Sequence, residues 1–123
     1  MDVVIVEDVP QDAKLLAHLV RGLGYEVEVK HNAQEAVQYV QDVPHLKAIL
    51  MNIMMPELDG REATEQIRQK LYNPVPIVGV SSNDSINDVE KAMQSGMNSF
   101  LSKPYNLEKL SQLLIKVGLR PSK

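Results

Sequence analysis

The chain has 123 residues, the size of one ordinary domain, and 44% of them are hydrophobic, enough for one continuous core. The net charge is -3 and the 13 Lys and Arg residues are scattered, so we expect no nucleic-acid partner. The absence of cysteine excludes disulfides, thiolate catalysis and cysteine-based metal sites. No apolar stretch is long enough to cross a bilayer and no signal peptide precedes the first apolar run, so the sequence predicts a soluble, cytoplasmic domain without a membrane partner.

Short apolar runs alternate with amphipathic segments along the whole chain. Strands are expected at residues 3–6, 25–29, 46–51, 76–80 and 99–102, and a helical pattern follows each of them. This alternation predicts an α/β fold, a doubly wound five-stranded parallel sheet with helices on both faces. With no repeat or internal linker, residues 1–119 are expected to form one domain and residues 120–123 a short tail or linker stub.

Capping residues mark where some of the helices begin and end. Asn32 with a glutamate three residues later, and Ser85 with Asp88, are expected to cap helices at their amino ends. Gly96 is a plausible stop for the second of these helices. Within that helix the apolar stripe is expected to consist of Ile86, Val89 and Met93.

Polar residues follow four of the expected strands, at the edge of the sheet where doubly wound proteins place their function. They are Glu7-Asp8, Asn52, Ser81-Ser82 and Lys103-Pro104. Adjacent carboxylates repel each other, so a cation or an ammonium group is expected near Glu7 and Asp8. Their hard oxygen atoms suit Mg²⁺. Taken singly, each of these residues is more often an ordinary solvated turn or surface residue.

Taken together and in this order, the polar residues resemble the receiver domain of two-component response regulators, from residue 3 to about residue 117. The resemblance implies the flavodoxin-like strand order 2-1-3-4-5. In it, Glu7 and Asp8 form the acidic pair and residues 52–60 the phosphoacceptor loop, with Asn52 at the phosphoacceptor position. The remaining matches are Ser81 as the switch hydroxyl, Phe100 as the switch aromatic, and Lys103 followed by Pro104, with a cis bond between them.

The resemblance implies a signalling module of a phosphorelay rather than an enzyme. In such a response regulator an aspartate takes a phosphoryl group from a sensor histidine kinase or phosphotransfer protein, with Mg²⁺ neutralising charge. The implied metal ligands are Glu7, Asp8, residue 52 and the Met54 carbonyl. Lys103 would pair with residue 52 and then, together with Ser81, bind the phosphoryl group while Phe100 moves inward. The fourth helix, fifth strand and fifth helix would then change their surface for a homodimer or an output domain.

Asn52 departs from this pattern, because a side-chain amide cannot form the labile acyl phosphate that makes a receiver domain a phosphoprotein. Mg²⁺ should also bind more weakly with one carboxylate fewer. Two explanations stay open: a receiver-like domain that has naturally lost phosphorylation, or a receiver captured as a deliberate phosphorylation-null variant. The other residues of the site are intact, which favours a site that was altered recently or artificially.

Three other functions are alternatives to a silenced receiver. A natural pseudo-receiver would act as a constitutive, phosphorylation-independent protein-binding module. A Mg²⁺-dependent phosphohydrolase with Asp8 as nucleophile would need a second aspartate two residues later, where the chain has Pro10. A flavin or nucleotide site would need glycines rather than two acids in the first turn after a strand.

Overall fold

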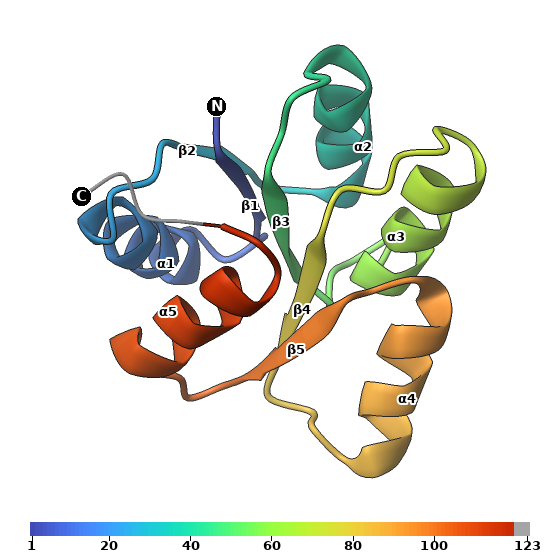
Figure 1. Ribbon diagram of the computed structural model, residues 1–123. Helices are drawn as coiled ribbons and strands as arrows, with labels where there is room; N and C mark the ends of the chain where they lie inside the picture. The colour runs from blue at the N-terminus through green and yellow to red at the C-terminus, as the bar shows by residue number, and fades with distance from the viewer. Residues whose placement is uncertain (120–123) are drawn as a thin grey trace.

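Five strands and five helices alternate along the computed structural model, which describes residues 1–119 (Figure 1). The strands are β1 (Val3–Val6), β2 (Val27–Lys30), β3 (Ala48–Asn52), β4 (Ile77–Ser81) and β5 (Ser99–Ser102). The helices are α1 (Pro10–Gly22), α2 (Ala33–Asp42), α3 (Gly60–Gln69), α4 (Ile86–Ser95) and α5 (Leu107–Lys116). None of these helices is long and apolar enough to span a membrane. The tail expected at 120–123 lies outside the described residues.

The five strands form one parallel sheet in the order β2-β1-β3-β4-β5. The expected α/β fold and the flavodoxin-like order are therefore confirmed. The chain first moves outward from β1 to β2 and then returns past β1 to β3, so the winding direction reverses between β1 and β3. A crevice is expected at the carboxyl ends of these two strands, because the crossover helices leave in opposite directions there.

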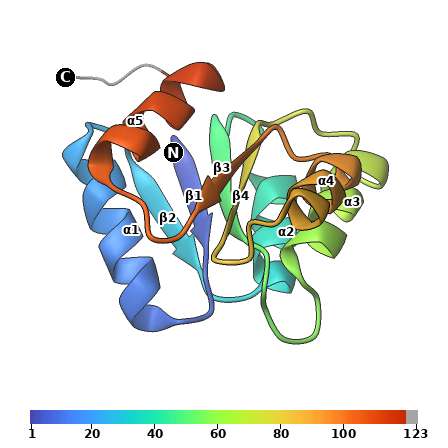
Figure 2. The ribbon, with the colours of Figure 1, turned by 90° about the horizontal axis from the view of Figure 1, so that it is seen from below.

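Helices cover both faces of the sheet (Figure 2). α1 and α5 lie on one face, and α2, α3 and α4 lie on the other. Successive side chains of β1 point to opposite faces: Val3 and Ile5 join the core under α1 and α5, while Val4 and Val6 join the core under α2, α3 and α4. Because both faces are covered, the three central strands β1, β3 and β4 are apolar at nearly every position, whereas half of the residues in the edge strands β2 and β5 are polar.

The capping predictions are confirmed. Asn32 Oδ1 accepts a hydrogen bond from the Glu35 N–H at 2.8 Å, and Ser85 Oγ accepts one from the Asp88 N–H at 3.1 Å. Gly96 ends α4 with a left-handed φ of 114°, a conformation that glycine adopts without strain. The boundaries of β2, β3 and β4 differ by one or two residues from the expected 25–29, 46–51 and 76–80, since these strands start later and end one residue later.

The apolar stripe expected on α4 is wrong. Ile86 is 81% exposed and Met93 is 36% exposed, and Ala92 is the buried residue of this helix. Ile86 is the first residue of α4, and the first turn of this helix lies beyond the end of β4 (Figure 1). Helical spacing alone does not show how far a helix extends past the strands that it covers.

Gly60 brings the start of α3 against the end of β3. Its N–H donates to the carbonyl of Ile53 at 3.0 Å. A Cβ at position 60 would lie 2.9 Å from Ile53 Cα and closer still to the backbone oxygen of Asn52. The helix is held in place by a capping box, in which Asp59 accepts from the Glu62 N–H and Glu62 accepts from the Asp59 N–H. α3 therefore supports the backbone of residue 52 directly.

We expect Gly60→Ala to lower the free energy of unfolding by about 1–3 kcal/mol, because the added methyl group overpacks a backbone contact. Gly22→Ala is the matched control, because a Cβ there meets nothing within 4 Å. That control should be neutral or stabilising by up to about 1 kcal/mol. Urea denaturation followed by circular dichroism measures both. Equal stability of the two variants would contradict the close approach of α3 to β3.

Candidate functional site

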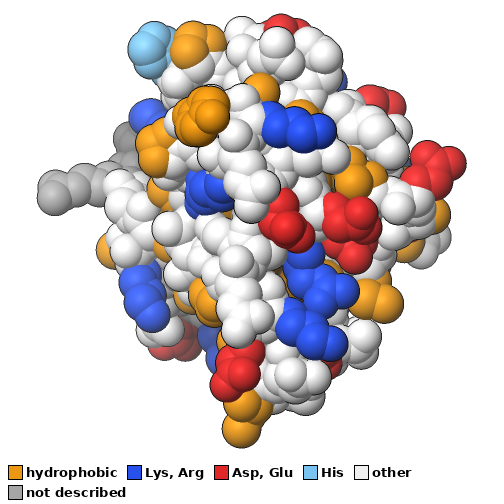
Figure 3. Space-filling view, turned by 90° about the vertical axis from the view of Figure 1, so that its right-hand side faces the viewer, with side chains coloured by type: hydrophobic (Ala, Val, Ile, Leu, Met, Phe, Trp, Pro, Cys, Tyr) orange, Lys and Arg blue, Asp and Glu red, His pale blue; other side chains and the backbone are white. Residues whose placement is uncertain are grey.

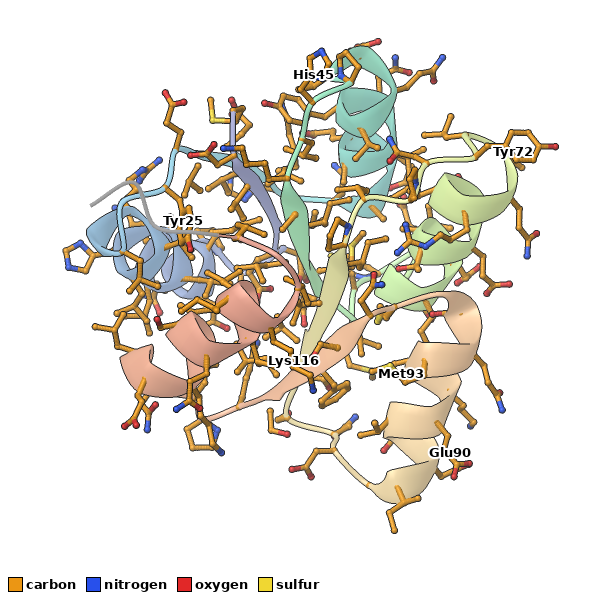
Figure 4. All side chains as sticks on the ribbon, viewed as in Figure 1. Tyr25, His45, Tyr72, Glu90, Met93 and Lys116 are labelled. Atoms are coloured by element: carbon orange, nitrogen blue, oxygen red, sulfur yellow. The ribbon has the colours of Figure 1, made fainter. Side chains whose placement is uncertain are left out.

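The register of the sheet brings the polar ends of three strands together. Val6 pairs with Met51 in the neighbouring strand, so Glu7 follows β1 at the level of Asn52, the last residue of β3. On the other side Asn52 pairs with Val80, one residue before Ser81. The exposed His45 and Tyr72 lie at the opposite edge of the sheet (Figure 4), away from this crevice.

The side-chain amide of Asn52 lies where the crevice is expected, between the carboxyl ends of β1 and β3, and residue 52 is only 7% exposed. Its Nδ2 donates to Glu7 Oε2 at 2.8 Å, to Asp8 Oδ1 at 3.1 Å and to the backbone carbonyl of Met54 at 3.2 Å. Hydrogen bonds to ionised acceptors are the stronger kind. The amide thus joins the ends of β1 and β3 to the loop that follows β3.

Glu7 is a buried carboxylate, 3% exposed. Its Oε2 accepts from the Val9 N–H at 3.2 Å as well as from Asn52, and its Oε1 lies 3.2 Å from Lys103 Nζ. The ammonium group expected near the acidic pair is therefore present. Burial raises the pKa of Glu7 and the neighbouring Asp8 raises it further, while the Val9 N–H and Lys103 act in the opposite direction.

Lys103 directly follows β5 at the same edge of the sheet, and its peptide bond to Pro104 is cis, as expected. The resemblance implies a pair between Lys103 and residue 52, but the ammonium group lies beside Glu7 and at 3.7 Å from Asp12 Oδ2. A neutral amide offers an ammonium group no charge, whereas the two carboxylates do. Lys103 therefore connects β5 to β1 and to the first turn of α1.

Two residues near this cluster were not foreseen from the sequence. Asp12 is the second partner of Lys103, and the only signal for it is its position four residues after Asp8, in the first turn of α1. Tyr105 follows the Lys103-Pro104 pair, and its pKa is raised to about 12 by burial and by the nearby charges of Asp12 and Glu7. The raised pKa keeps the phenol protonated further into the alkaline range than an ordinary tyrosine.

The switch residues of the resemblance lie beside the cluster. Ser81 is buried, and its Oγ accepts from the Asn83 N–H at 3.0 Å. Phe100 is half-buried and packs against the core under α2, α3 and α4. A cavity of about 30 Å³, room for about one water molecule, lies between Ser81, Met54 and Asn83.

A larger hollow of about 470 Å³ lies between α3 and α4, away from the strand ends. Charges of both signs are mixed on this face (Figure 3). The lining residues are Asp59, Arg61, Glu62, Glu65, Lys91, Gln94 and Ser95. No single kind of ligand is favoured by such a mixed, open surface, so the candidate site remains the crevice around Asn52.

A divalent cation in this crevice would need oxygen ligands whose lone pairs are free to bind it. Glu7, Asp8 and the Met54 carbonyl supply oxygen atoms of the kind that Mg²⁺ prefers. All three of them contact Asn52 Nδ2, however, which presents N–H groups where a ligand would present a lone pair. Within residues 1–119, no three His, Cys, Asp or Glu side chains gather in a way that could hold a metal ion. In this arrangement the residues do not fit Mg²⁺.

Comparison with protein families matches residues 3–115 to the family described as response regulator receiver domain. Among curated relatives, sensor histidine kinase RcsC of Escherichia coli (strain K12) is 33% identical over 114 residues, covering 93% of this chain and 12% of that protein. Sensor histidine kinase GacS of Pseudomonas protegens is 32% identical over 118 residues, covering 93% and 13%. The chain thus spans about an eighth of the length of these relatives.

Solved structures agree with the sequence comparison. The receiver domain of sensor histidine kinase PA1611 from Pseudomonas aeruginosa PAO1, described with a magnesium ion coordinated in the active site cleft, is 33% identical with a TM-score of 0.86, covering 96% of this chain and 98% of that one. Chemotaxis protein CheY4 of Vibrio cholerae is 26% identical with a TM-score of 0.87, covering 94% and 97%. By fold and by sequence, this chain belongs to the response regulator receiver domain family of two-component signalling.

Proposed function

We propose that residues 1–119 form a receiver domain whose phosphoacceptor position is occupied by Asn52, so that the domain works through protein contacts without being phosphorylated. The observation that carries this proposal is the position of the Asn52 amide, at the reversal point of the sheet and in contact with both carboxylates of the acidic pair. In the family this crevice is where a phosphoryl group is accepted, and here its central side chain is neutral.

The chemistry of the amide explains the silencing. A carboxylate oxygen can attack phosphorus and form an acyl phosphate as the bond between phosphorus and the phosphodonor breaks, whereas the lone pair of an amide nitrogen is delocalised into its carbonyl group. The Asn52 nitrogen also has both carboxylates as hydrogen-bond acceptors, so its N–H groups rather than its lone pairs face the crevice. Lys103 and Ser81 remain at the adjacent strand ends, where they would contact a phosphoryl group on residue 52.

Magnesium binding is proposed to be weakened in this chain. The receiver domain of PA1611 is described with magnesium in its active site cleft, and it is 33% identical to this chain. Glu7, Asp8 and the Met54 carbonyl would be the remaining ligands, together with the amide oxygen of Asn52 once the amide has rotated. One carboxylate fewer lowers the electrostatic attraction for a divalent cation.

The proposed partners are proteins. The curated relatives RcsC and GacS are sensor histidine kinases, which supports a histidine kinase or phosphotransfer protein as the partner of this chain. A second partner, a homodimer mate or an output domain, is proposed for the surface of α4, β5 and α5. α4 and α5 carry exposed apolar side chains, Ile86, Leu107 and Ile115, which support a contact with another protein.

Intact-mass analysis after incubation with Mg²⁺ and a small-molecule phosphodonor tests the silencing. We expect the unaltered chain to gain nothing and Asn52→Asp to gain the mass of one phosphoryl group, because only the variant has a nucleophilic oxygen in the crevice. Asn87→Asp, which adds a carboxylate to the exposed surface of α4, is the matched control and should gain nothing. If Asn52→Asp also stays unmodified, the domain is a constitutive binding module instead.

Thermal melting in chelator and in Mg²⁺ provides a second test. In chelator we expect Asn52→Asp to melt roughly 5–10 °C lower than the unaltered chain, because a third carboxylate replaces hydrogen bonds worth about 2 kcal/mol. Added Mg²⁺ should raise the Tm of Asn52→Asp more than that of the unaltered chain. Equal Mg²⁺ responses of the two proteins would refute the weakened metal site.

A further inference from the structure

We propose that the side-chain NH₂ group of Asn52 takes the structural place of a divalent cation, holding the acidic crevice together without metal and competing with any metal that enters. The proposal rests on the proposed function in one respect, the assignment of this crevice as the receiver site. It goes further because it assigns Asn52 a structural role of its own. The amide is then a built-in connector, and not merely a missing nucleophile or a weaker ligand.

The geometry supports this role at the level of single atoms. One nitrogen atom, Asn52 Nδ2, lies 2.8, 3.1 and 3.2 Å from an oxygen of Glu7, of Asp8 and of the Met54 backbone. These three groups are the ligands that the resemblance assigns to the metal. The nitrogen therefore has the same neighbours that a bound cation would have, and its two N–H groups are shared among the three oxygen atoms.

The charges of the crevice show why such a connector is needed. Two adjacent carboxylates end β1, and Lys103 contacts only one of them, through Glu7 Oε1. The second partner of Lys103 is Asp12, outside this pair. Asn52 is the side chain that contacts Glu7 and Asp8 at once. Its partial positive charge offsets their repulsion, since within residues 1–119 no ammonium group contacts both carboxylates.

The connection extends to the loop after β3. The bond from Asn52 Nδ2 to the Met54 carbonyl ties this loop to β1, and the contact of Gly60 with Ile53 ties the other end of the loop to β3. A divalent cation can enter only if the amide rotates and all three hydrogen bonds break. Metal binding is then a competition with an internal group, so the crevice keeps its shape in chelator.

Mg²⁺ affinities of three proteins distinguish competition from simple ligand loss. If Asn52 were only a weak ligand, Asn52→Ala would bind Mg²⁺ no more tightly than the unaltered chain. If the amide competes, Asn52→Ala removes the competitor and should bind Mg²⁺ about tenfold more tightly than the unaltered chain, with Asn52→Asp tighter still. Isothermal titration calorimetry with MgCl₂ measures the three constants. An Asn52→Ala protein that binds as weakly as the unaltered chain, or more weakly, overturns the proposal.

Nuclear magnetic resonance of the unaltered chain tests the same proposal without any substitution. The two Nδ2 protons of Asn52 should exchange with solvent much more slowly than those of Asn87, an exposed asparagine that serves as internal control. The Asn52 signals should be the same in chelator and in buffer. Exchange as fast as that of Asn87 would overturn the proposal, even if Asn52→Ala failed to fold.

These outcomes are independent of phosphorylation. If Asn52→Asp accepts a phosphoryl group but Asn52→Ala gains no affinity for Mg²⁺, the receiver site is supported and the connector role is rejected. The reverse result, slow amide exchange with no transfer to Asn52→Asp, would support the connector and reject the silenced receiver.

Discussion

A carboxylate buried beside another carboxylate is the constraint on which the rest of this crevice depends. Removing Glu7 from water is costly unless donors replace the lost hydration. The fold supplies three donors from three places: the Val9 N–H in the same turn, the Lys103 ammonium group at the end of β5, and the Asn52 amide at the end of β3. Satisfying one carboxylate therefore holds three strand ends together.

The sheet topology makes this convergence possible. Parallel strands place all their carboxyl ends at one edge, and the order β2-β1-β3-β4-β5 puts β1 between the strand that precedes the reversal and the strand that follows it. Gly60 adds a second contact, because the absence of a Cβ allows α3 to approach the backbone of β3. The backbone of residue 52 is fixed by its pairing with β4 and by its contact with Gly60 at the start of α3. The side chain therefore has little freedom to move away from the acidic pair.

Much of this arrangement could be predicted from residue patterns. Runs such as Val3–Val6 are apolar at every position because both faces of the sheet are covered, and that signal is local. The failures involve contacts between distant segments. The α4 stripe was wrong because Ile86 extends past the sheet, and nothing in its neighbours along the chain records this. Arg68 gave no signal at all, yet its guanidinium donates to the carbonyl oxygens of Gly96, Asn73 and Val75 and joins α3 to two loops.

The sequence by itself determined the order of the elements, the parallel sheet and the absence of a nucleophile at position 52, because apolar periodicity and the identity of a side chain are local properties. Only the tertiary structure decided what the amide does. The orientation of the Asn52 amide depends on distances between groups that are 44 or more residues apart along the chain. The same holds for the contacts of Lys103, which pairs with Glu7 and Asp12 and not with residue 52. Electrostatic compensation acts through space, so the partners of a buried charge are known only once the strands have been placed side by side.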